Sequence, residues 1–276
     1  MNLKVYKIIM AIMVWLAFAG PALAVVPDED DDLLKEANSL LEQFKDSEAL
    51  EKFQLILLDK PDHYEALFKA SLLKSRIGAR YTDETEKIQY YTAAKVYAES
   101  ALKVQPKGAD SHYAMALAIN NLTMVTGPKD RLVNLHIIKE HLDKALNINP
   151  EHAAAWQLLG RWYYKVANLN FLEATATKFL TGALPVGASN YRAIESLQKS
   201  IVLNPLNISG YYDLAIIYHD TKQITESIQV LQEALKLNLI TSEDLEISRR
   251  CKAMLQQISD DIVIKSTSTR TVPVRI

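Results

Sequence analysis

Six histidines are the first candidates for chemistry, because neutral imidazole is a common metal ligand. His136 and His141 lie five residues apart. That spacing corresponds to about 140° around a helix, so the two side chains are expected on different faces. We therefore expect no zinc site. The full set is His63, His112, His136, His141, His152 and His219.

The sequence contains no motif that indicates an enzyme. A glycine-rich phosphate loop, a Gly-x-Ser-x-Gly nucleophile elbow and a His-Glu-x-x-His helix are all missing from it. Carboxylates such as Glu195 and Glu233 lie beside lysines on amphipathic segments, which is typical of solvated helix faces. Cys251 is the only cysteine, so no intramolecular disulfide can form, and we expect it to be a small buried hydrophobe. Catalytic residues, metal ligands and cofactors are therefore not expected.

Another group of side chains is a candidate for binding. The helical repeat of this sequence places aromatic, amide and basic residues on the face that helical solenoids turn toward their concave groove. Aromatic rings supply contact area there, while arginine and asparagine can hold a peptide backbone or a carboxylate. Arg161 has a structural alternative, because it can also bridge helices or satisfy carbonyl groups around an insertion at residues 168–190. The candidates are Arg76, Tyr113, Asn120, Gln157, Arg161, Tyr164, Tyr212 and His219.

Four prolines divide the chain into repeated units. Pro61, Pro106, Pro150 and Pro205 each follow a helix-like run that ends in an aliphatic residue. Proline has no amide hydrogen and clashes with the preceding helical turn, so each one marks the end of a helix. Stacked helix pairs of this kind are typical of an all-α solenoid.

Offsets from these prolines superimpose the units and give a consensus. Trp156, Leu159, Gly160 and Tyr163 follow Pro150 with spacings that resemble the tetratricopeptide consensus of Trp, Leu, Gly and Tyr. The same offsets after Pro205 give Tyr211, Leu214, Ala215 and Tyr218, and Leu67 and His112 occupy the first offset in earlier units. We expect a tetratricopeptide-like domain over residues 33–260, closed by a capping helix from Ser242 to Ser259.

The spacing of the prolines departs from the simple repeat. Tetratricopeptide repeats span about 34 residues, whereas these prolines are 45, 44 and 55 residues apart. The additional residues fall at 78–90, 123–135 and 168–190, inside three of the units. The first two segments predict lengthened helices or longer loops.

The third insertion differs, because it can form a helix of its own. Residues 171–180 are predicted to be a short helix, and residues 182–187 an apolar loop. We expect Phe171, Leu172, Phe179 and Leu180 to pack against the repeats, since four exposed apolar side chains would form a patch that monomers avoid.

A family resemblance depends on this insertion. The run Gly160-Arg161-Trp162-Tyr163, then Val166-Ala167-Asn168-Leu169, then the segment from Phe179 to Pro185, resembles the regulator of microtubule dynamics family of tetratricopeptide-like proteins. The resemblance covers roughly residues 33–258. It implies an all-helical interaction protein without known catalytic machinery, and eukaryotic members of the family associate with microtubules.

The first 24 residues have the pattern of an export signal. Lys4 and Lys7 precede an apolar stretch from Ile8 to Gly20, and Ala22-Leu23-Ala24 ends it with small residues. The stretch is shorter than the roughly 20 residues of a spanning helix, so we expect cleavage after Ala24, no stable membrane anchor, and a periplasmic or secreted protein. Residues 25–32 are expected to be an acidic flexible leader, and residues 261–276 an extended or disordered tail.

Charge and composition point to a protein partner. The net charge is −2 and becomes more negative once the two signal lysines are removed, which disfavours nucleic acid. We expect an exported module that binds a peptide or protein in its concave groove. The alternative is a structural scaffold subunit of an envelope or secretion assembly that uses the convex surface and the tail.

The mature protein is predicted to begin at Val25. N-terminal sequencing of the protein recovered from the exported fraction measures this directly. Recovery of chains that still begin at Met1 in washed membranes would show that the segment is a retained anchor.

Overall fold

The computed structural model describes residues 29–270, and within them the chain forms twelve α-helices and no strand. The helices are α2 (Glu29–Glu42), α3 (Asp46–Asp59), α4 (Tyr64–Ala79), α5 (Glu84–Val104), α6 (Ala109–Val125), α7 (Pro128–Ile148), α8 (Ala153–Ala167), α9 (Phe171–Thr181), α10 (Asn190–Leu203), α11 (Ile208–Asp220), α12 (Ile224–Ala234) and α13 (Ser242–Arg270).

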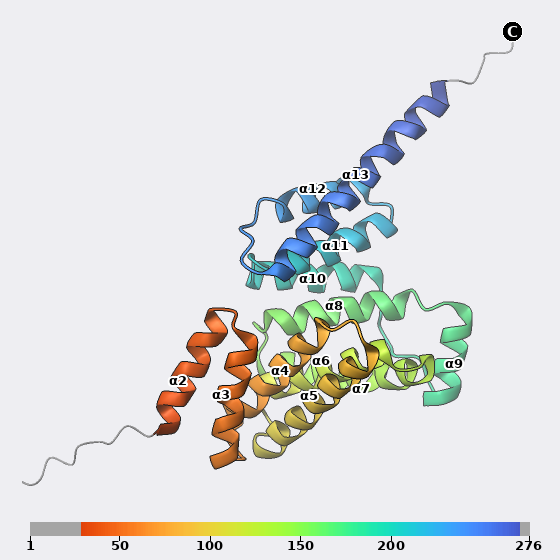
Figure 1. The fold of residues 1–276 in the computed structure, drawn as a ribbon. Helices are drawn as coiled ribbons and strands as arrows, with labels where there is room; N and C mark the ends of the chain where they lie inside the picture. The colour runs from red at the N-terminus through yellow and green to blue at the C-terminus, as the bar shows by residue number, and fades with distance from the viewer. Residues whose placement is uncertain (1–28, 271–276) are drawn as a thin grey trace, which may run out of the picture.

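The helices pack as consecutive antiparallel pairs that stack into a solenoid (Figure 1). The pairs are α2 with α3, α4 with α5, α6 with α7, α8 with α10, and α11 with α12, and α13 packs on α11 and α12. The predicted all-α, tetratricopeptide-like solenoid with a C-terminal capping helix is confirmed.

The four prolines mark the joint between one pair and the next. Each lies two residues after the end of a helix and three residues before the start of another. The first backbone amides of the new helix need acceptors, because they have no intrahelical partner. His63 and His152 supply a ring nitrogen to the amides of Ala66 and Ala155. Two of the six histidines therefore act as helix caps.

The first consensus position has one structural role in three units. His112, Trp156 and Tyr211 each lie six residues after a proline, and each bonds the carbonyl oxygen of that proline at 3.1, 2.8 and 3.1 Å. These three hydrogen bonds tie each inter-pair turn to the helix that follows it. The offsets deduced from the sequence therefore superimpose equivalent positions.

Small side chains let the paired helices approach closely. Ala94, Ala98 and Ala101 on α5 have no exposed surface, and a Cβ added at Gly160 on α8 would lie 2.7 Å from Leu197 Cγ of α10. The large side chain that packs against Gly160, that of Leu197, is also buried. Complete burial of a leucine such as Leu197 contributes about 1.5–3 kcal/mol, so the stacked pairs form a continuous core.

The first two insertions lengthen helices. Helices α5 and α7 have 21 residues each and α6 has 17, compared with 13 in α11. Of the two possibilities left open by the sequence, longer helices account for most of the additional residues.

The third insertion forms α9, which packs beside α7. Asn170 and Glu173 make a capping box at its start, and Gly182 ends it with a φ of +82°. His136 Nε2 lies 3.1 Å from both Thr181 Oγ1 and the carbonyl oxygen of Ala183. The predicted short helix is therefore present, and it is fixed to the solenoid at its C-terminal end.

The predicted burial of the apolar side chains of α9 was largely wrong. Phe171, Leu172 and Phe179 are 83, 77 and 89% exposed, and of the four only Leu180 packs partly against the core. The reason is geometric. A helix that contacts one neighbour can cover only one of its faces, and here that face carries Thr177 and Leu180.

Both ends of the domain contain more helix than the sequence predicted. Helix α2 begins at Glu29, inside the expected flexible leader, and α13 continues to Arg270, so residues 261–270 are not the predicted extended or disordered tail. Extending an existing helix adds one hydrogen bond per residue without new nucleation, and β-branched residues reduce helix propensity only slightly. The predicted signal segment and residues 271–276 lie outside the described residues.

Substitution of Gly160 by alanine is predicted to destabilise the protein by about 1–3 kcal/mol, because the new methyl group overlaps Leu197 and the α10 backbone. The matched control is Gly210→Ala on α11, where the nearest atom is an ordinary contact at 3.4 Å. Since alanine is a better helix former than glycine, this control is expected to be neutral or stabilising. Urea unfolding of both variants measures the difference, and equal free energies of unfolding would contradict the close approach.

Candidate functional site

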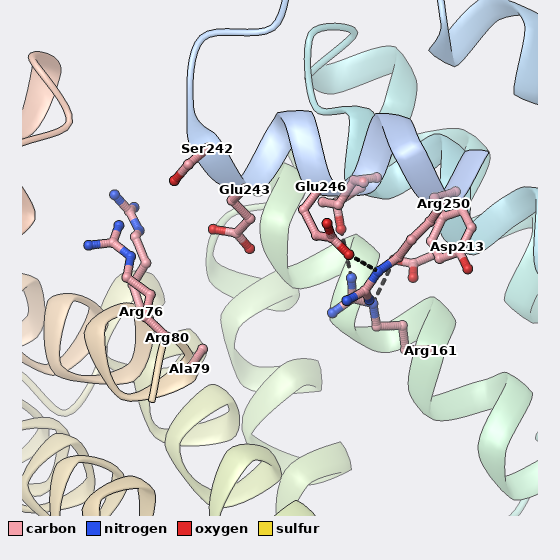
Figure 2. Close-up of a pocket in the computed structure, with 12 residues that line it drawn as sticks. Arg76, Ala79, Arg80, Arg161, Asp213, Ser242, Glu243, Glu246 and Arg250 are labelled. Atoms are coloured by element: carbon pink, nitrogen blue, oxygen red, sulfur yellow. Dashed lines mark hydrogen bonds and ion pairs between the residues drawn. The ribbon is translucent and has the colours of Figure 1, made fainter. Parts of the chain in front are cut away.

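A charged cleft separates α4 from the N-terminal half of α13. Its main part has a volume of about 490 Å³ and is also lined by residues of α8 and α11. A second part of about 380 Å³ continues toward α3 and shares Arg76, Arg80 and Glu243 with the first. Figure 2 shows the arginines of α4 on one side and the carboxylates of α13 on the other. We call the two parts together the α4–α13 cleft.

The α4 side of the cleft is built on a buried carboxylate. Asp46 is the first residue of α3, and its side chain is fully buried. Arg76 Nη1 donates to one carboxylate oxygen at 2.8 Å, and Arg80, one turn further along α4, donates to the other. The two arginine side chains are 41 and 50% exposed. Each guanidinium therefore keeps N–H groups available in the cleft.

The α13 side presents three acidic residues, and of these only Glu246 forms an ion pair within the described residues. Glu246 pairs with Arg250 at 3.1 Å and with Arg249 at 3.7 Å. Asp244 accepts hydrogen bonds from the backbone amides of Ile240 and Thr241, just before α13, so it serves as a helix cap. Glu243 is exposed and forms no ion pair with any residue in the described range 29–270.

Arg161 connects α8 to α11 at the centre of the cleft. Its Nε donates to Asp213 Oδ2 at 2.5 Å, and its Nη2 donates to Ser209 Oγ at 2.8 Å. Gln157 bonds the same two acceptors at 2.7 and 3.0 Å. Burial opposes the charge of the guanidinium, but the Asp213 carboxylate outweighs burial and raises the pKa of Arg161. Arg161 therefore bridges α8 and α11, which is the structural role considered for it from the sequence, and it also lines the cleft.

The structure brings only part of the predicted groove set together. Arg76, Arg161 and Tyr212 line the main part of the cleft. The ring of Tyr113 packs against His152 with 4.7 Å between ring centroids. Burial raises the pKa of the Tyr113 hydroxyl above its usual value, although the positive charges of Arg161 and Arg76 act in the opposite direction. Tyr113 is thus within electrostatic reach of both arginines.

The other predicted residues serve different contacts. Gln157 is buried between α8 and α11, and Asn120 lines another cavity of about 280 Å³, which shares Arg161 with the main part of the cleft. Tyr164 donates its hydroxyl hydrogen to Asp220, and burial together with this carboxylate raises its pKa to about 12. His219 lines a pocket between α11 and α13, which shares Tyr212 and Arg250 with the main part of the cleft. These four residues do not form the main cleft.

Sequence reasoning missed most of the lining of the cleft, including Arg80, Asp46 and Glu243. Arg80 follows Arg76 by four residues, which places both on one face of a helix, so the spacing was an available signal. No sequence signal pointed to Asp46 or Glu243, because they reach the cleft only through the packing of α3 and α13 in the solenoid.

The remaining histidines form a structural pair. His112 and His141 lie with their Nδ1 atoms 2.9 Å apart. A carbonyl oxygen only accepts, so His112 carries its hydrogen on Nε2 toward the proline carbonyl, and its Nδ1 accepts from His141. Burial lowers the pKa of His141 to about 4. Because the unfolded histidine takes up a proton near pH 6.5, acidification below that pH favours unfolding through this residue.

The described part of the chain shows no grouped metal ligands and one buried cysteine. Among residues 29–270, no group of three His, Cys, Asp or Glu side chains is arranged to hold a metal ion. Cys251 is buried, as expected, and burial raises its pKa to about 11. Its thiol is therefore protonated at neutral pH and a poor nucleophile. In the same described range, no helix is long and apolar enough to cross a bilayer.

Arg161→Ala is predicted to reduce the free energy of unfolding by about 1–2 kcal/mol, because Asp213, whose side chain is 15% exposed, loses its charged partner. The control is Arg249→Ala on α13, where the arginine side chain is 68% exposed and a change below about 0.5 kcal/mol is expected. Circular-dichroism melts and urea titrations compare the two variants. A loss at Arg161 no larger than at Arg249 would rule out the bridging role.

Comparison with solved structures agrees with the fold. The tetratricopeptide repeat protein TTC0263 of Thermus thermophilus superimposes with a TM-score of 0.58 at 17% sequence identity, over 82% of this chain and 99% of that chain. At this identity the likeness concerns the fold alone.

Comparison with known sequences identifies relatives over most of the chain. Regulator of microtubule dynamics protein 3 of Xenopus laevis is 28% identical over 238 residues, which cover 85% of this chain and 51% of that protein. The protein of the same name from Rattus norvegicus is 30% identical over 237 residues, or 82% of this chain and 50% of the relative. The chain thus spans about half the length of the curated relatives it matches. The family described as "Regulator of microtubule dynamics protein 1-3" matches residues 33–259, and the chain belongs to this family.

Proposed function

We propose that this chain is a protein-interaction module that binds an extended segment of a partner protein in the α4–α13 cleft, without a reaction of its own. The observation that supports this proposal is the lining of the cleft. Charged and aromatic side chains from α4, α8, α11 and α13 converge there, and Arg76 and Arg80 expose guanidinium edges that can bond a peptide.

The aromatic contribution comes from Tyr212, which lines the cleft beside Arg161 and Arg250. A tyrosine ring offers a large contact area and fixes few rotatable bonds on binding. Tyr113 does not line the cleft and packs against His152. We infer that the predicted concave site is narrower than the full candidate set and that Arg76, Arg161 and Tyr212 are its members.

A photo-reactive phenylalanine analogue at Tyr212 is predicted to crosslink to a partner segment in cells that express the protein. The matched control carries the same analogue at Val202 of α10, which is 74% exposed and lies outside the cleft. Mass spectrometry of the adducts identifies the crosslinked peptides. Adducts that are equally abundant at both positions, or that appear only at Val202, would contradict the cleft as the binding site.

A second candidate function is association with microtubules. The observation in its favour is family membership, because the relatives are named as regulators of microtubule dynamics. Co-sedimentation of the purified chain with polymerised tubulin tests this directly. Loss of co-sedimentation in a Tyr212→Ala variant would assign the contact to the same cleft.

We also propose that the protein is exported, to the periplasm or the exterior, on the strength of the signal pattern in residues 1–24. An exported chain is separated from cytoplasmic filaments, so N-terminal sequencing at Val25 also discriminates between the two candidate functions. In that compartment a scaffold role in an envelope or secretion assembly is the alternative to peptide binding.

A further inference from the structure

We propose that the α4–α13 cleft selects a peptide segment of mixed charge, which presents one carboxylate to Arg76 and Arg80 and one cationic side chain to Glu243. This inference rests on the proposed function and names the chemistry of the segment that the cleft takes.

The α4 side has an excess of one positive charge. Arg76 and Arg80 share a single carboxylate, that of Asp46, and have no other ion pair with any described residue. Asp46 lines the second part of the cleft, but its side chain is fully buried and both of its oxygens already accept from the two guanidinium groups. Two arginines fixed on one anchor form a preorganised site for a second carboxylate, because little rotamer freedom remains to be lost.

The α13 side has the opposite excess. Three carboxylates, those of Glu243, Asp244 and Glu246, stand here against two arginines, Arg249 and Arg250, which both pair with Glu246, while Asp244 caps the helix. Glu243 remains, exposed and without an ion pair among the described residues. Figure 2 shows its carboxylate on the side of α13 that faces the arginines of α4. The two excess charges lie on opposite sides of one cleft and are not joined by an ion pair.

This arrangement restricts the ligand by charge. A carboxylate carries a single negative charge and matches the single excess positive charge on α4. A polyanion such as nucleic acid would bring further negative charges close to Glu243, Glu246 and Asp213, and like charges at such distances are repulsive. A segment with one acidic and one basic residue satisfies both sides, and it can enter in one orientation only.

Selection from random dodecapeptides displayed within a phage coat protein tests the proposal. Peptides that bind the full chain are expected to be enriched in sequences with one Asp or Glu close to one Lys or Arg. Comparison with the Tyr212→Ala variant, which should fail to retain them, shows that they bind in the cleft. A second arm uses synthetic versions with a free or an amidated C-terminus, which distinguishes a side-chain carboxylate from a chain end.

Two variants remove the excess charges one at a time. Arg80→Gln leaves Asp46 bonded to Arg76, and it is expected to weaken binding about tenfold and to abolish the preference for an acidic residue. Glu243→Lys is expected to abolish the preference for a basic residue. The controls are Lys199→Gln on α10 and Glu226→Lys in the first turn of α12; both residues are exposed and lie outside the cleft. Melting curves establish that each variant is folded, and if Arg80→Gln is not, Glu243→Lys alone decides.

The outcomes separate this inference from the proposed function. Cleft-binding peptides without a charge preference, or a preference that persists in both variants, would overturn the mixed-charge inference and leave peptide binding in place. Failure to enrich any peptide that depends on Tyr212 would overturn both.

Discussion

The structure depends on the close approach of paired helices. A single amphipathic helix cannot cover its own apolar face, so each one is stable only against its partner and its neighbours in the stack. Ala98 on α5 and Gly160 on α8 make that approach possible, because both positions are buried and a larger side chain at Gly160 would overlap Leu197. The short turns at the prolines then fix how one pair follows the next.

The cleft is a consequence of this stacking. Helices α4 and α13 are far apart in sequence, and they face each other because the intervening pairs curve the solenoid (Figure 1). Within the curve, polar groups are held by partners on neighbouring helices. Arg161 reaches Asp213 across the α8–α11 contact, and Asp46 holds two arginines across the α3–α4 contact. Removing one partner of such a buried group costs more than the pair contributes, so these contacts resist change and keep the cleft in shape.

The repeat could be predicted from sequence because its signals are local. A proline ends a helix wherever it occurs, and the bond from His112, Trp156 or Tyr211 to a proline carbonyl spans six residues. The burial of α9 could not be predicted in this way. Its amphipathic pattern shows that one face is apolar, but whether a neighbour covers Phe171 and Phe179 depends on where the solenoid places α7.

The candidate site was predictable to the extent that it lies on single helices. Arg76 and Arg161 were found from helical offsets, whereas Glu243 enters the cleft only through the position of α13. The same limit explains the change in the role of Arg161. An arginine on a predicted concave face is free to bind a ligand only if no carboxylate on the next helix reaches it first, and Asp213, which lies fifty-two residues later in the chain, does reach it. The free charges of the cleft are therefore those that the packing leaves uncompensated, on α4 and on α13.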